Sequence, residues 1–502
     1  MKPFLLGSPV SVLDLSQVAS GCRAARLPPS ARARVARARR VLEGVIASGE
    51  PVYGVNTGFG QLASRRIPPE AIRTLQVNLV RSHACGVGAP LSPETARAIV
   101  FLRANELARG YSGCRPELVE FLVRLLSRGI VPVIPSRGSV GASGDLAPLA
   151  HAALVLLGEG RARVQTGGRW SAEMSAARAL GLAGLQPMRL EAKEGLSLVN
   201  GTQAMQAVGA LALFQARLVA AAADLAGAMS LEAIRGTPVA YEEALVRLKP
   251  HPGQMRVASR LRSLLEGSEI RESHRVGDVR VQDPYSFRCI PQVHGAVQES
   301  LEFAVAAVER EMRGVTDNPV VIGRRLVSGG NFHGQALSAA FDLAAIALTT
   351  LGNIAERRIA QLVSGGHGLP AFLADKPGLE SGFMIAQVAA AALASENKVL
   401  AHPASIDTIP TSADQEDFVS MGMAAALKLE TVLAHAAQIV AIELLAAARA
   451  VERRWPLRPG RGVQRGVERL RSEVPDGRGD AALSEALSKV KIMVLGGRFG
   501  PS

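Results

Sequence analysis

The sequence predicts an all-α protein, and three observations lead to this fold class. Good helix formers, chiefly alanine, leucine, arginine and glutamate, fill many long segments of the 502 residues. Runs of β-branched residues are short. Several helical segments are apolar on nearly all sides, as helices are in the centre of a long bundle or at subunit contacts. A chain of this length exceeds a single core of roughly 250–300 residues, so two or more substructures are expected.

Ten helices are predicted, and glycine and proline punctuate the chain between them. Five lie in the first third of the chain, at 31–48, 69–82, 93–109, 115–127 and 146–157. Five more follow, at 202–226, 293–313, 335–362, 382–400 and 420–453. The last of these leaves little polar face, because its apolar residues include Leu429, Val432, Leu433, Ala436, Ile439, Val440, Leu444 and Leu445.

The helix at 146–157 has a well-marked start. Asp145 suits an N-cap, and Pro148 suits the first turn, where a missing backbone donor costs little. The partial positive charge of this helix N-terminus would lie beside the tripeptide 142–144. It would therefore favour negative charge that develops there during a reaction.

Glycine-rich segments are predicted to be loops, at 53–60, 137–145 and 328–331. Functional residues commonly lie on such loops between helix ends. We expect a helical N-terminal domain over residues 1–200, which carries the second of these loops. A C-terminal domain of long bundled helices is expected over residues 201–502, although no Ser/Gly linker marks the boundary.

The net charge of +13 comes mostly from arginine, which raises the question of a nucleic-acid partner. However, the arginines are spread along helical stretches, and only 4% of residues are aromatic, which leaves few stacking platforms for bases. A solvated arginine-rich surface, with its tail over residues 452–478, is the favoured interpretation. We expect no nucleic-acid partner.

Cysteine and histidine spacing indicates neither disulfides nor a metal. The four cysteines are far apart without a CxxC pair, and the nine histidines do not cluster, which suits a reducing cytoplasm. Pro9 and Asp14 interrupt the short apolar N-terminal stretch, so it does not resemble a signal peptide. The uncharged stretch 195–216 is long enough to span a bilayer, but its polar side chains favour a buried helix. We expect a soluble cytoplasmic protein that does not enter a membrane.

The tripeptide Ala142-Ser143-Gly144 is the most informative feature of the chain. Three small residues can turn tightly enough for the Gly144 nitrogen to attack the Ala142 carbonyl carbon. Loss of two waters, one of them from the Ser143 hydroxyl, would leave a conjugated methylidene. This group is an electrophile, which no ordinary side chain provides. Taken alone, the tripeptide is more often a flexible turn that leads into a helix.

The surrounding motifs resemble the aromatic amino acid ammonia-lyase family, from Val52 to Met423. They are the runs at 53–60, 80–88, 138–151, 198–203, 281–289, 329–333 and 413–418. The resemblance implies that Ala142, Ser143 and Gly144 form 4-methylideneimidazol-5-one (MIO). It also implies a fumarase/aspartase-like fold with a loop-rich head and a long central helix bundle. A homotetramer whose active sites take residues from more than one chain is implied as well.

The family motifs assign roles to individual residues. Tyr53 corresponds to the catalytic base that removes the β-proton of the substrate. Arg288 corresponds to the guanidinium that binds the substrate carboxylate. Gln282 and Tyr285 correspond to hydrogen-bonding residues around the amine and the ring. Three further residues line the pocket or bind the ring in the family, and these are Asn200, Phe332 and Met384.

Two positions indicate histidine as the substrate. Ser82-His83 is the pair that histidine-specific members carry, whereas tyrosine and phenylalanine enzymes have His-Leu and Phe-Leu. Glu416 adds an acidic partner for the substrate imidazole, which titrates near ~6.5. The resemblance therefore implies that L-histidine is converted to trans-urocanate and ammonia, the first step of histidine breakdown.

Two features depart from the family pattern. Asp414 and Phe418 stand where the family has asparagine and histidine, which bears on the ionisation of Glu416. Gly334-Gln335 is closer to the general family than to its histidine-specific form. Each position also has a structural alternative: Tyr53 as a packing residue, Arg288 as a surface ion-pair partner, Asn200 bonded to backbone, Phe332 and Met384 in the core, His83 as a structural histidine and Glu416 in the first turn of a helix.

The residues leave other functions open. Either the amine or the imidazole of the substrate could react with the ring. A lyase or aminomutase for tyrosine or phenylalanine, with the same ring, is the runner-up. A catalytically silent helical scaffold or an arginine-rich nucleic-acid binder is the alternative from a different class.

Overall fold

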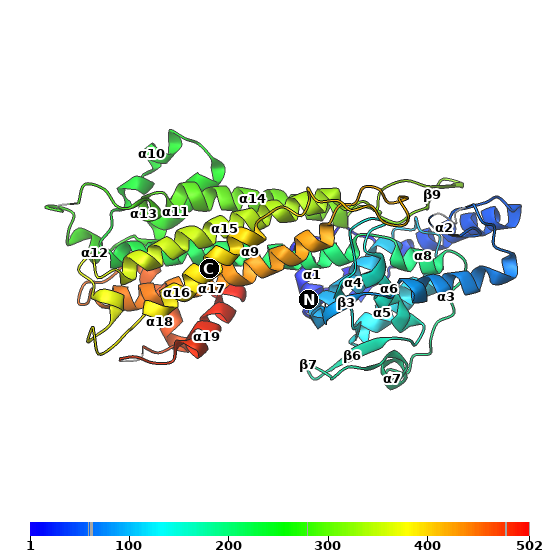
Figure 1. Ribbon diagram of the computed structural model, residues 1–502, viewed down its shortest axis with the longest axis horizontal. Coiled ribbons are helices and arrows are strands. Elements are labelled where there is room, and N and C mark those ends of the chain that lie inside the picture. Colours follow the sequence, from blue (N-terminus) through cyan, green and yellow to red (C-terminus); the bar gives the residue numbers. More distant parts are fainter. Residues whose placement is uncertain (59, 61–63, 279, 477–478, 501–502) are drawn as a thin grey trace. The chain divides into compact units, whose positions relative to one another are not determined.

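The computed structural model describes residues 1–58, 60, 64–278, 280–476 and 479–500 (Figure 1). The chain packs into two compact units. Unit 1 comprises residues 1–211, 305–341 and 403–427, and unit 2 comprises residues 212–304, 342–402 and 428–502. Residues 1–200 therefore all belong to unit 1, whereas residues 201–502 contribute to both units. The division into domains at residue 200 stays a prediction.

The shorter helices of unit 1 come mostly from the N-terminal part of the chain. They are α1 (Val12–Ala19), α2 (Pro29–Ser48), η2 (Pro69–Ala71), α3 (Ile72–His83), α4 (Pro93–Leu107), α5 (Pro116–Ser127), α6 (Leu146–Leu156), α7 (Ala176–Leu182) and α8 (Glu194–Val199). Their starts carry the expected local chemistry. Ser11 and Asp14 form a reciprocal capping box at α1, and the Ser92 hydroxyl accepts the Thr95 N–H at α4.

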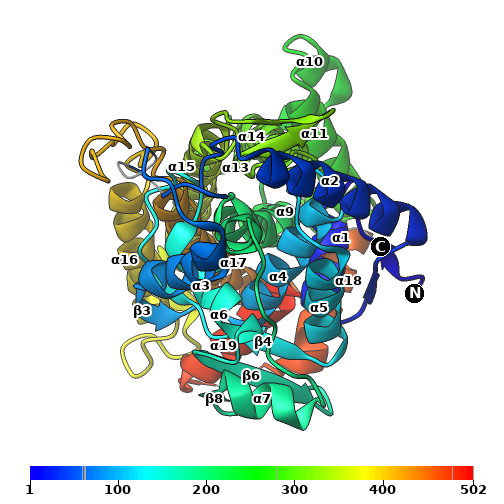
Figure 2. The ribbon, with the colours of Figure 1, turned by 90° about the vertical axis from the view of Figure 1, so that its right-hand side faces the viewer.

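All the strands of the described chain are short and lie in unit 1. They are β1 (Phe4–Leu5), β2 (Ala25–Arg26), β3 (Val87–Pro90), β4 (Ile130–Pro132), β5 (Pro135–Arg137), β6 (Arg161–Thr166), β7 (Arg169–Trp170), β8 (Met174–Ser175), β9 (Val320–Ile322) and β10 (Arg325–Val327). β1 pairs with β2 in parallel, whereas β3 with β5 and β9 with β10 pair antiparallel. β6 pairs with β4, β7 and β8, and α7 lies beside this small sheet (Figure 2).

Unit 2 contains shorter helices from the middle and end of the chain. They are η3 (Pro238–Tyr241), α10 (Glu243–Arg247), α11 (Pro252–Leu264), α12 (Glu269–Glu272), α13 (Tyr285–Arg288), η4 (Ala371–Leu373), α16 (Met384–Leu400), α18 (Arg461–Glu473) and α19 (Leu483–Leu495). Four long helices contribute residues to both units: α9 (Gln203–Ala233), α14 (Ile290–Met312), α15 (Gln335–Val363) and α17 (Gly422–Glu452).

The predicted all-α class is confirmed, and all ten predicted helices are present. Three of the long helices, α9, α15 and α17, are long and apolar enough to cross a membrane. However, 67%, 72% and 78% of their most apolar windows are buried inside the protein. Their apolar side chains are therefore used mainly to build the core, as the sequence predicted for the stretch 195–216.

Candidate active site

The tripeptide Ala142-Ser143-Gly144 lies in a sharply folded loop immediately before α6. Ser143 has a φ of 50° and Gly144 a φ of 72°, both in the left-handed region. Gly144 pairs with Gly201 in a β-bridge, and a Cβ at Gly144 would overlap the Gly201 carbonyl. The next residue, Asp145, donates its backbone N–H to that carbonyl oxygen at 2.7 Å. Only glycine therefore fits the third position of the tripeptide.

Asp145 stands at the N-cap position of α6, but its side chain does not cap that helix. One carboxylate oxygen accepts the Ser139 hydroxyl at 2.8 Å, and the other accepts the Met205 N–H in the first turn of α9, also at 2.8 Å. The prediction that this side chain caps its own helix is therefore wrong, because the start of α9 lies within reach. Burial raises the pKa of Asp145 to about 6, against the hydrogen bonds that lower it.

Glu416 contacts the tripeptide directly. The Ser143 hydroxyl donates to one carboxylate oxygen of Glu416 at 3.1 Å, and the Thr411 hydroxyl donates to the other at 2.7 Å. Glu416 also pairs with Thr411 in an antiparallel bridge that closes a tight loop. The alternative that Glu416 lies in the first turn of a helix is wrong, because α17 begins only at Gly422. Three loop residues have positive φ instead, namely Ser412, Ala413 and Asp414.

Two cavities of unit 1 surround this contact. The first has a volume of about 390 Å³, and the predicted site residues that line it are Tyr53, Ala142, Ser143, Asn200, Phe332 and Glu416. The second, of about 660 Å³, shares four of these residues and adds Ser82 and His83. Counting Gly144 but not Ser82, the fold therefore brings eight predicted site residues together from loops and helix ends far apart in the sequence. Their individual roles stay predictions.

Tyr53 lies in an irregular loop, as the three glycines of this segment predicted. Its hydroxyl oxygen accepts the Gly60 N–H at 3.2 Å. The Asn56 carboxamide fixes the loop, because its oxygen accepts the Val52 N–H at 2.7 Å and its amide donates to the Glu50 carbonyl at 2.7 Å. Phe59 of the same motif lies outside the described residues.

His83 is the last residue of α3. Its Nδ1 lies 3.0 Å from the Ser82 hydroxyl oxygen. Burial lowers the pKa of His83, whereas the hydrogen bond to the Leu79 backbone and the negative charge of Glu416 act in the opposite direction. His83 and Glu416 thus influence each other electrostatically across the 660 Å³ cavity that both line.

Asn200 ends α8 and is 3% exposed. Its backbone carbonyl accepts an N–H from Arg103 Nη1 at 2.8 Å. Its side-chain oxygen, by contrast, is buried and has no hydrogen-bond partner among the described residues. An acceptor of this kind is costly to bury unless a ligand or a modified group supplies the donor.

The other four predicted residues lie in unit 2. Gln282 precedes α13, Tyr285 and Arg288 are its first and last residues, and Met384 begins α16. The Arg288 guanidinium lies 4.5 Å from the centre of the Tyr285 ring, and this ring is 71% exposed. No carboxylate among the described residues forms an ion pair with Arg288, contrary to the ion-pair alternative. The residues that line the two cavities all belong to unit 1.

Sequence reasoning did not assign a role in the site to three residues, His333, Phe418 and Thr411. The His333 ring stacks on Phe418 with 5.9 Å between ring centres and an angle of 16°. Both line the cavity, so the departure at Phe418 places an aromatic wall there. Thr411 anchors Glu416 through its hydroxyl group. The position of His333 next to Phe332 in its motif was the only available indication.

The residues around the tripeptide fit an MIO ring. The two consecutive positive φ angles fold the loop back on itself, and the close approach of Gly201 excludes any side chain at Gly144. The Ser143 hydroxyl is held by a carboxylate, and Asn200, whose side-chain oxygen has no partner among the described residues, lines the same cavity as Ser143. The chain thus offers a tight turn, a positioned hydroxyl and a buried acceptor.

Comparisons with known proteins agree with this arrangement. The aromatic amino acid lyase family matches residues 10–472. A histidine ammonia-lyase of Anaeromyxobacter dehalogenans is 51% identical over 98% of the chain and 99% of the relative. The crystal structure of histidine ammonia-lyase from Trypanosoma cruzi is 40% identical, with a TM-score of 0.91 over 100% of this chain and 96% of that one.

A related activity appears among the similar structures as well. The tyrosine aminomutase of Streptomyces globisporus is 35% identical, with a TM-score of 0.92 over 99% of this chain and 97% of that one. The chain has the fumarase/aspartase-like helical fold that was predicted. From these matches and the geometry of the site, the chain belongs to the aromatic amino acid lyase family.

Proposed function

We propose that the chain is a histidine ammonia-lyase, which converts L-histidine to trans-urocanate and ammonia. The observation that carries the proposal is that His83 and Glu416 line one cavity with Ser143. These two side chains offer an imidazole and a carboxylate to a substrate imidazole. The names of relatives that are 51% and 40% identical support the same activity.

The proposed prosthetic group is MIO, formed from Ala142, Ser143 and Gly144. When formed, it supplies an electrophile that activates the substrate for loss of ammonia. The α6 N-terminus directly after the tripeptide favours negative charge at this position. Asn200 would bind the ring or the substrate carboxylate through its side chain, and the Phe332 ring would form an apolar wall.

Tyr53 is proposed to remove the β-proton of the substrate. It lines both cavities, so its ring borders the volume that the substrate would occupy. The Gly60 N–H donates to its hydroxyl oxygen at 3.2 Å and so helps to fix the position of the phenol group. This arrangement suits a tyrosine that acts as a general base.

His83 and Glu416 are proposed to select histidine. Because burial favours the neutral form of His83, its ring can donate or accept one hydrogen bond with the substrate imidazole. Glu416 would accept the N–H of the substrate imidazole while His83 donates to its other ring nitrogen. A phenyl side chain offers neither contact, and a phenol offers one oxygen instead of two separate ring nitrogens, so at least one of these polar groups would lose its partner.

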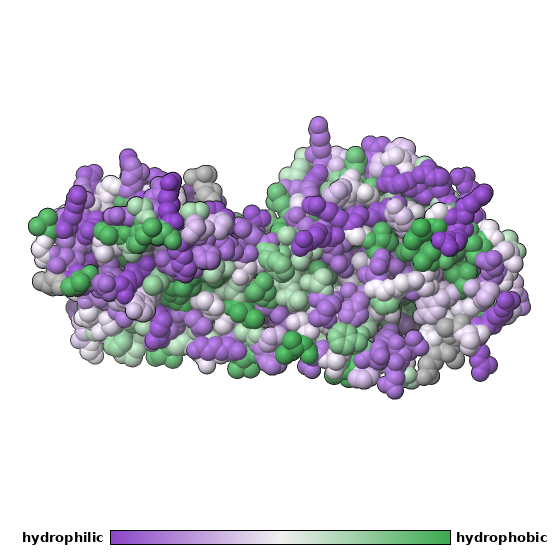
Figure 3. Space-filling model, turned by 90° about the horizontal axis from the view of Figure 1, so that it is seen from above, coloured by the Kyte–Doolittle hydropathy of each residue, from purple (hydrophilic) through white to green (hydrophobic). Residues whose placement is uncertain are grey.

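We further propose a homotetramer in which a second copy supplies Gln282, Tyr285, Arg288 and Met384. Helix α16 supports this idea, because its outward face carries Ile385 at 67%, Val388 at 52% and Val399 at 76% exposure. One face of the molecule shows further groups of apolar residues among hydrophilic ones (Figure 3). Such exposed apolar side chains are typical of subunit contacts.

We propose a cytoplasmic location because the four cysteines are free thiols. Cys22 and Cys85 are exposed, and Cys114 and Cys289 are free as well. Exposed free thiols suit a reducing compartment.

A spectrophotometric assay tests the function. Purified protein with L-histidine should show growing urocanate absorbance, and Ser143→Ala should abolish it. The intact mass of the wild type should be lower than the sequence mass by two water molecules, whereas Ser143→Ala should not form the ring. Turnover of tyrosine or phenylalanine without turnover of histidine would instead select the aminomutase or lyase alternative. A full mass with salt-sensitive DNA binding would select the scaffold or nucleic-acid alternative.

A further inference from the structure

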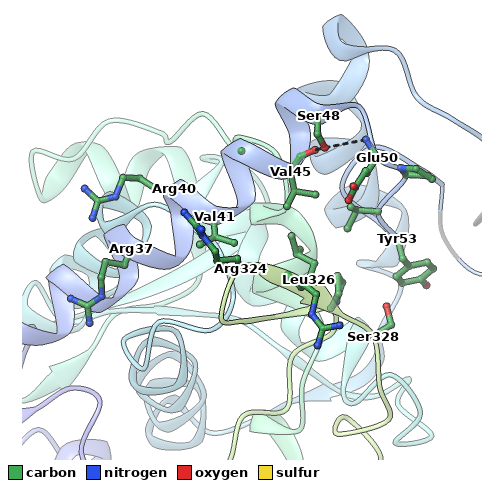
Figure 4. A pocket seen from close by; sticks show the side chains of 15 residues that line it. Arg37, Arg40, Val41, Val45, Ser48, Glu50, Tyr53, Arg324, Leu326 and Ser328 are labelled. Carbon is green, nitrogen blue, oxygen red and sulfur yellow. Dashed lines mark hydrogen bonds between the residues drawn. The ribbon is translucent and has the colours of Figure 1, made fainter.

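A third cavity of unit 1, of about 910 Å³, lies between helix α2 and the β9–β10 hairpin (Figure 4). Its volume is within the range of small-molecule sites. Arg37 and Arg40 extend from α2, and Arg324 comes from the turn of the hairpin, beside Arg325 on β10. Four guanidinium groups therefore line one cavity.

These four arginines differ from most others in the chain. None of them forms an ion pair with a carboxylate of the described residues. On the same helix α2, by contrast, Arg39 pairs with Glu43 at 2.7 Å and Arg32 pairs with Glu120 at 2.8 Å. Glu50 is the single acidic residue among the described lining residues. The cavity thus concentrates positive charge that the protein itself does not neutralise.

The remaining wall is suited to an organic molecule rather than a bare ion. Ser48 and Ser328 contribute hydroxyl groups, and Val41, Val45 and Leu326 contribute apolar surface. Guanidinium groups bind carboxylate and phosphate oxygens with paired hydrogen bonds. Arg37 and Arg40 are three residues apart on α2, so they share one face of the helix.

The cavity borders the proposed active site. Tyr53 and Ser328 line both this cavity and the 390 Å³ cavity next to Ser143. Figure 4 shows these two residues together at the end of the cavity opposite Arg37. A molecule bound among the arginines would therefore lie near the ring of the proposed catalytic base.

We propose that this cavity binds a small organic anion with two or more carboxylate or phosphate groups, and that its occupancy lowers the rate of the lyase reaction. The binding itself goes beyond the proposed function and does not depend on it. Only the effect on rate rests on the assignment of Tyr53.

Isothermal titration calorimetry on the full-length protein at low ionic strength tests the binding. The probes are citrate, which carries carboxylates, and pyrophosphate, which carries phosphates. We expect saturable binding of at least one probe, and the tighter one identifies the preferred anion. Arg324→Gln/Arg325→Gln should weaken it at least about tenfold, because it removes two of the four guanidinium groups that line the cavity.

A matched control uses two arginines of unit 1 outside the cavity. Arg128 and Arg178 are exposed and have no carboxylate partner among the described residues. Arg128→Gln/Arg178→Gln lowers the net charge by the same amount and should leave the affinity within about twofold. If both double variants weaken binding equally, the effect is only the net charge, and the proposal is overturned.

Variants of the opposite wall keep the test independent of the hairpin. Arg37→Gln/Arg40→Gln should also weaken binding at least about tenfold. The site can therefore be tested even if the hairpin variant fails to fold. Absence of saturable binding of both probes to the wild type would overturn the site. Saturable binding with an unchanged rate of urocanate formation would overturn the inhibitory effect alone. Because calorimetry requires no turnover, an inactive protein would still report on the site.

Discussion

Glu416 combines two contacts that matter at the scale of single residues. Its carboxylate accepts hydrogen bonds from Ser143 and Thr411, so it is held next to the tripeptide before any ring has formed. It also lines the same cavity as His83. A carboxylate in this place can hold a substrate imidazole, and its charge is more important than its shape for that purpose.

Glu416→Gln is predicted to lower kcat/KM for L-histidine by about 10²–10³, because the amide keeps the size but loses the charge. Steady-state kinetics by urocanate absorbance measures the effect, and intact mass confirms that the ring still forms. The control Glu70→Gln changes an exposed acid on η2 and should have wild-type kinetics. Unchanged kinetics in Glu416→Gln would remove Glu416 from the site.

Asp145 gives a pH prediction with a definite sign. Burial raises its pKa from 3.8 to about 6, so the folded chain binds a proton that the unfolded chain releases between these values. Its contribution to stability is fully present below about pH 3.8 and is lost as the pH rises through about 6. Burial lowers the pKa of several histidines, among them His83, and these act in the opposite direction.

Asp145→Asn removes this titration. From about pH 5 to about pH 7, the stability of the wild type relative to the variant is predicted to fall by about 1 kcal/mol, because about one pKa unit of the shift is titrated there. Urea denaturation of both proteins at the two pH values measures the difference. The lost charge alters stability at every pH, so only the change with pH is diagnostic. A constant difference would show that Asp145 does not titrate in this range.

At the scale of elements, the sequence predicted the long helices well and the small ones poorly. Helix α6 begins and ends within one residue of its prediction because Asp145 and the apolar run mark it. Helix α18 was taken as part of a solvated arginine-rich tail. Its Val463 and Leu470 are nevertheless buried, because tertiary packing uses a narrow apolar stripe between the charges.

In the candidate site, too, the sequence predicted the features that local sequence marks and not those that depend on tertiary packing. Motif residues such as Tyr53, Ser143 and Asn200 were found because their local sequences are distinctive. The loop that carries Glu416 could not be derived, since its positive φ angles fall on Ser412, Ala413 and Asp414, and none of these is glycine. Contacts between loops distant in the sequence, such as Ser143 with Glu416 or His333 with Phe418, depend on the fold as a whole.

Buried side chains hold the short helix α13 through hydrogen bonds to its backbone carbonyls. The buried Tyr241 hydroxyl donates to the Phe287 carbonyl at 2.7 Å, and Arg358 Nη1 donates to the Ser286 carbonyl at 3.4 Å. Arg358 in turn forms a buried ion pair with Glu443, in which Nη2 donates to Oε2 at 2.8 Å. The turn that ends in Arg288 is therefore anchored from the interior of unit 2.

Tyr241→Phe is predicted to destabilise the protein by about 1–3 kcal/mol, because the buried Phe287 carbonyl loses the hydroxyl donor that holds it. Urea denaturation followed by circular dichroism measures the loss. Tyr111→Phe, at a tyrosine that is 46% exposed, is the control and should change stability by less than about 0.5 kcal/mol. Equal effects in the two variants would contradict the anchoring role.

At the scale of the whole molecule, both units bury ion pairs rather than apolar residues alone. In unit 1 the Lys193 ammonium donates to both Asp317 oxygens at 2.9 Å, and both side chains are 0% exposed. In unit 2 the Arg358–Glu443 pair is likewise 0% exposed. Removing one partner of such a pair is far more costly than exchanging both, since the remaining charge stays buried. Each unit therefore contains a buried ion pair that disfavours alternative packings in which its partners separate.

The exposed residues of α13 and α16 suggest a different use for the surface of unit 2. If a second copy supplies Arg288 to the cavity that contains Ser143, one active site requires two intact chains. Ser143→Ala and Arg288→Ala should each be inactive as pure proteins. Co-expression of the two variants distinguishes active sites shared between chains from active sites within one chain. If the sites are shared, some sites of a hybrid tetramer combine an intact Ser143 with an intact Arg288.

With equal amounts of the two variants and random assembly, about a quarter of the shared sites should carry an intact Ser143 from one chain and an intact Arg288 from another. Co-expressed protein with two different affinity tags, purified through both, should therefore recover up to about this fraction of wild-type kcat. Mixing the separately purified tetramers without exchange is the control and should recover nothing. Inactive hybrids with normal assembly would mean that Ser143 and Arg288 do not meet across chains, and the proposal of shared sites would be wrong.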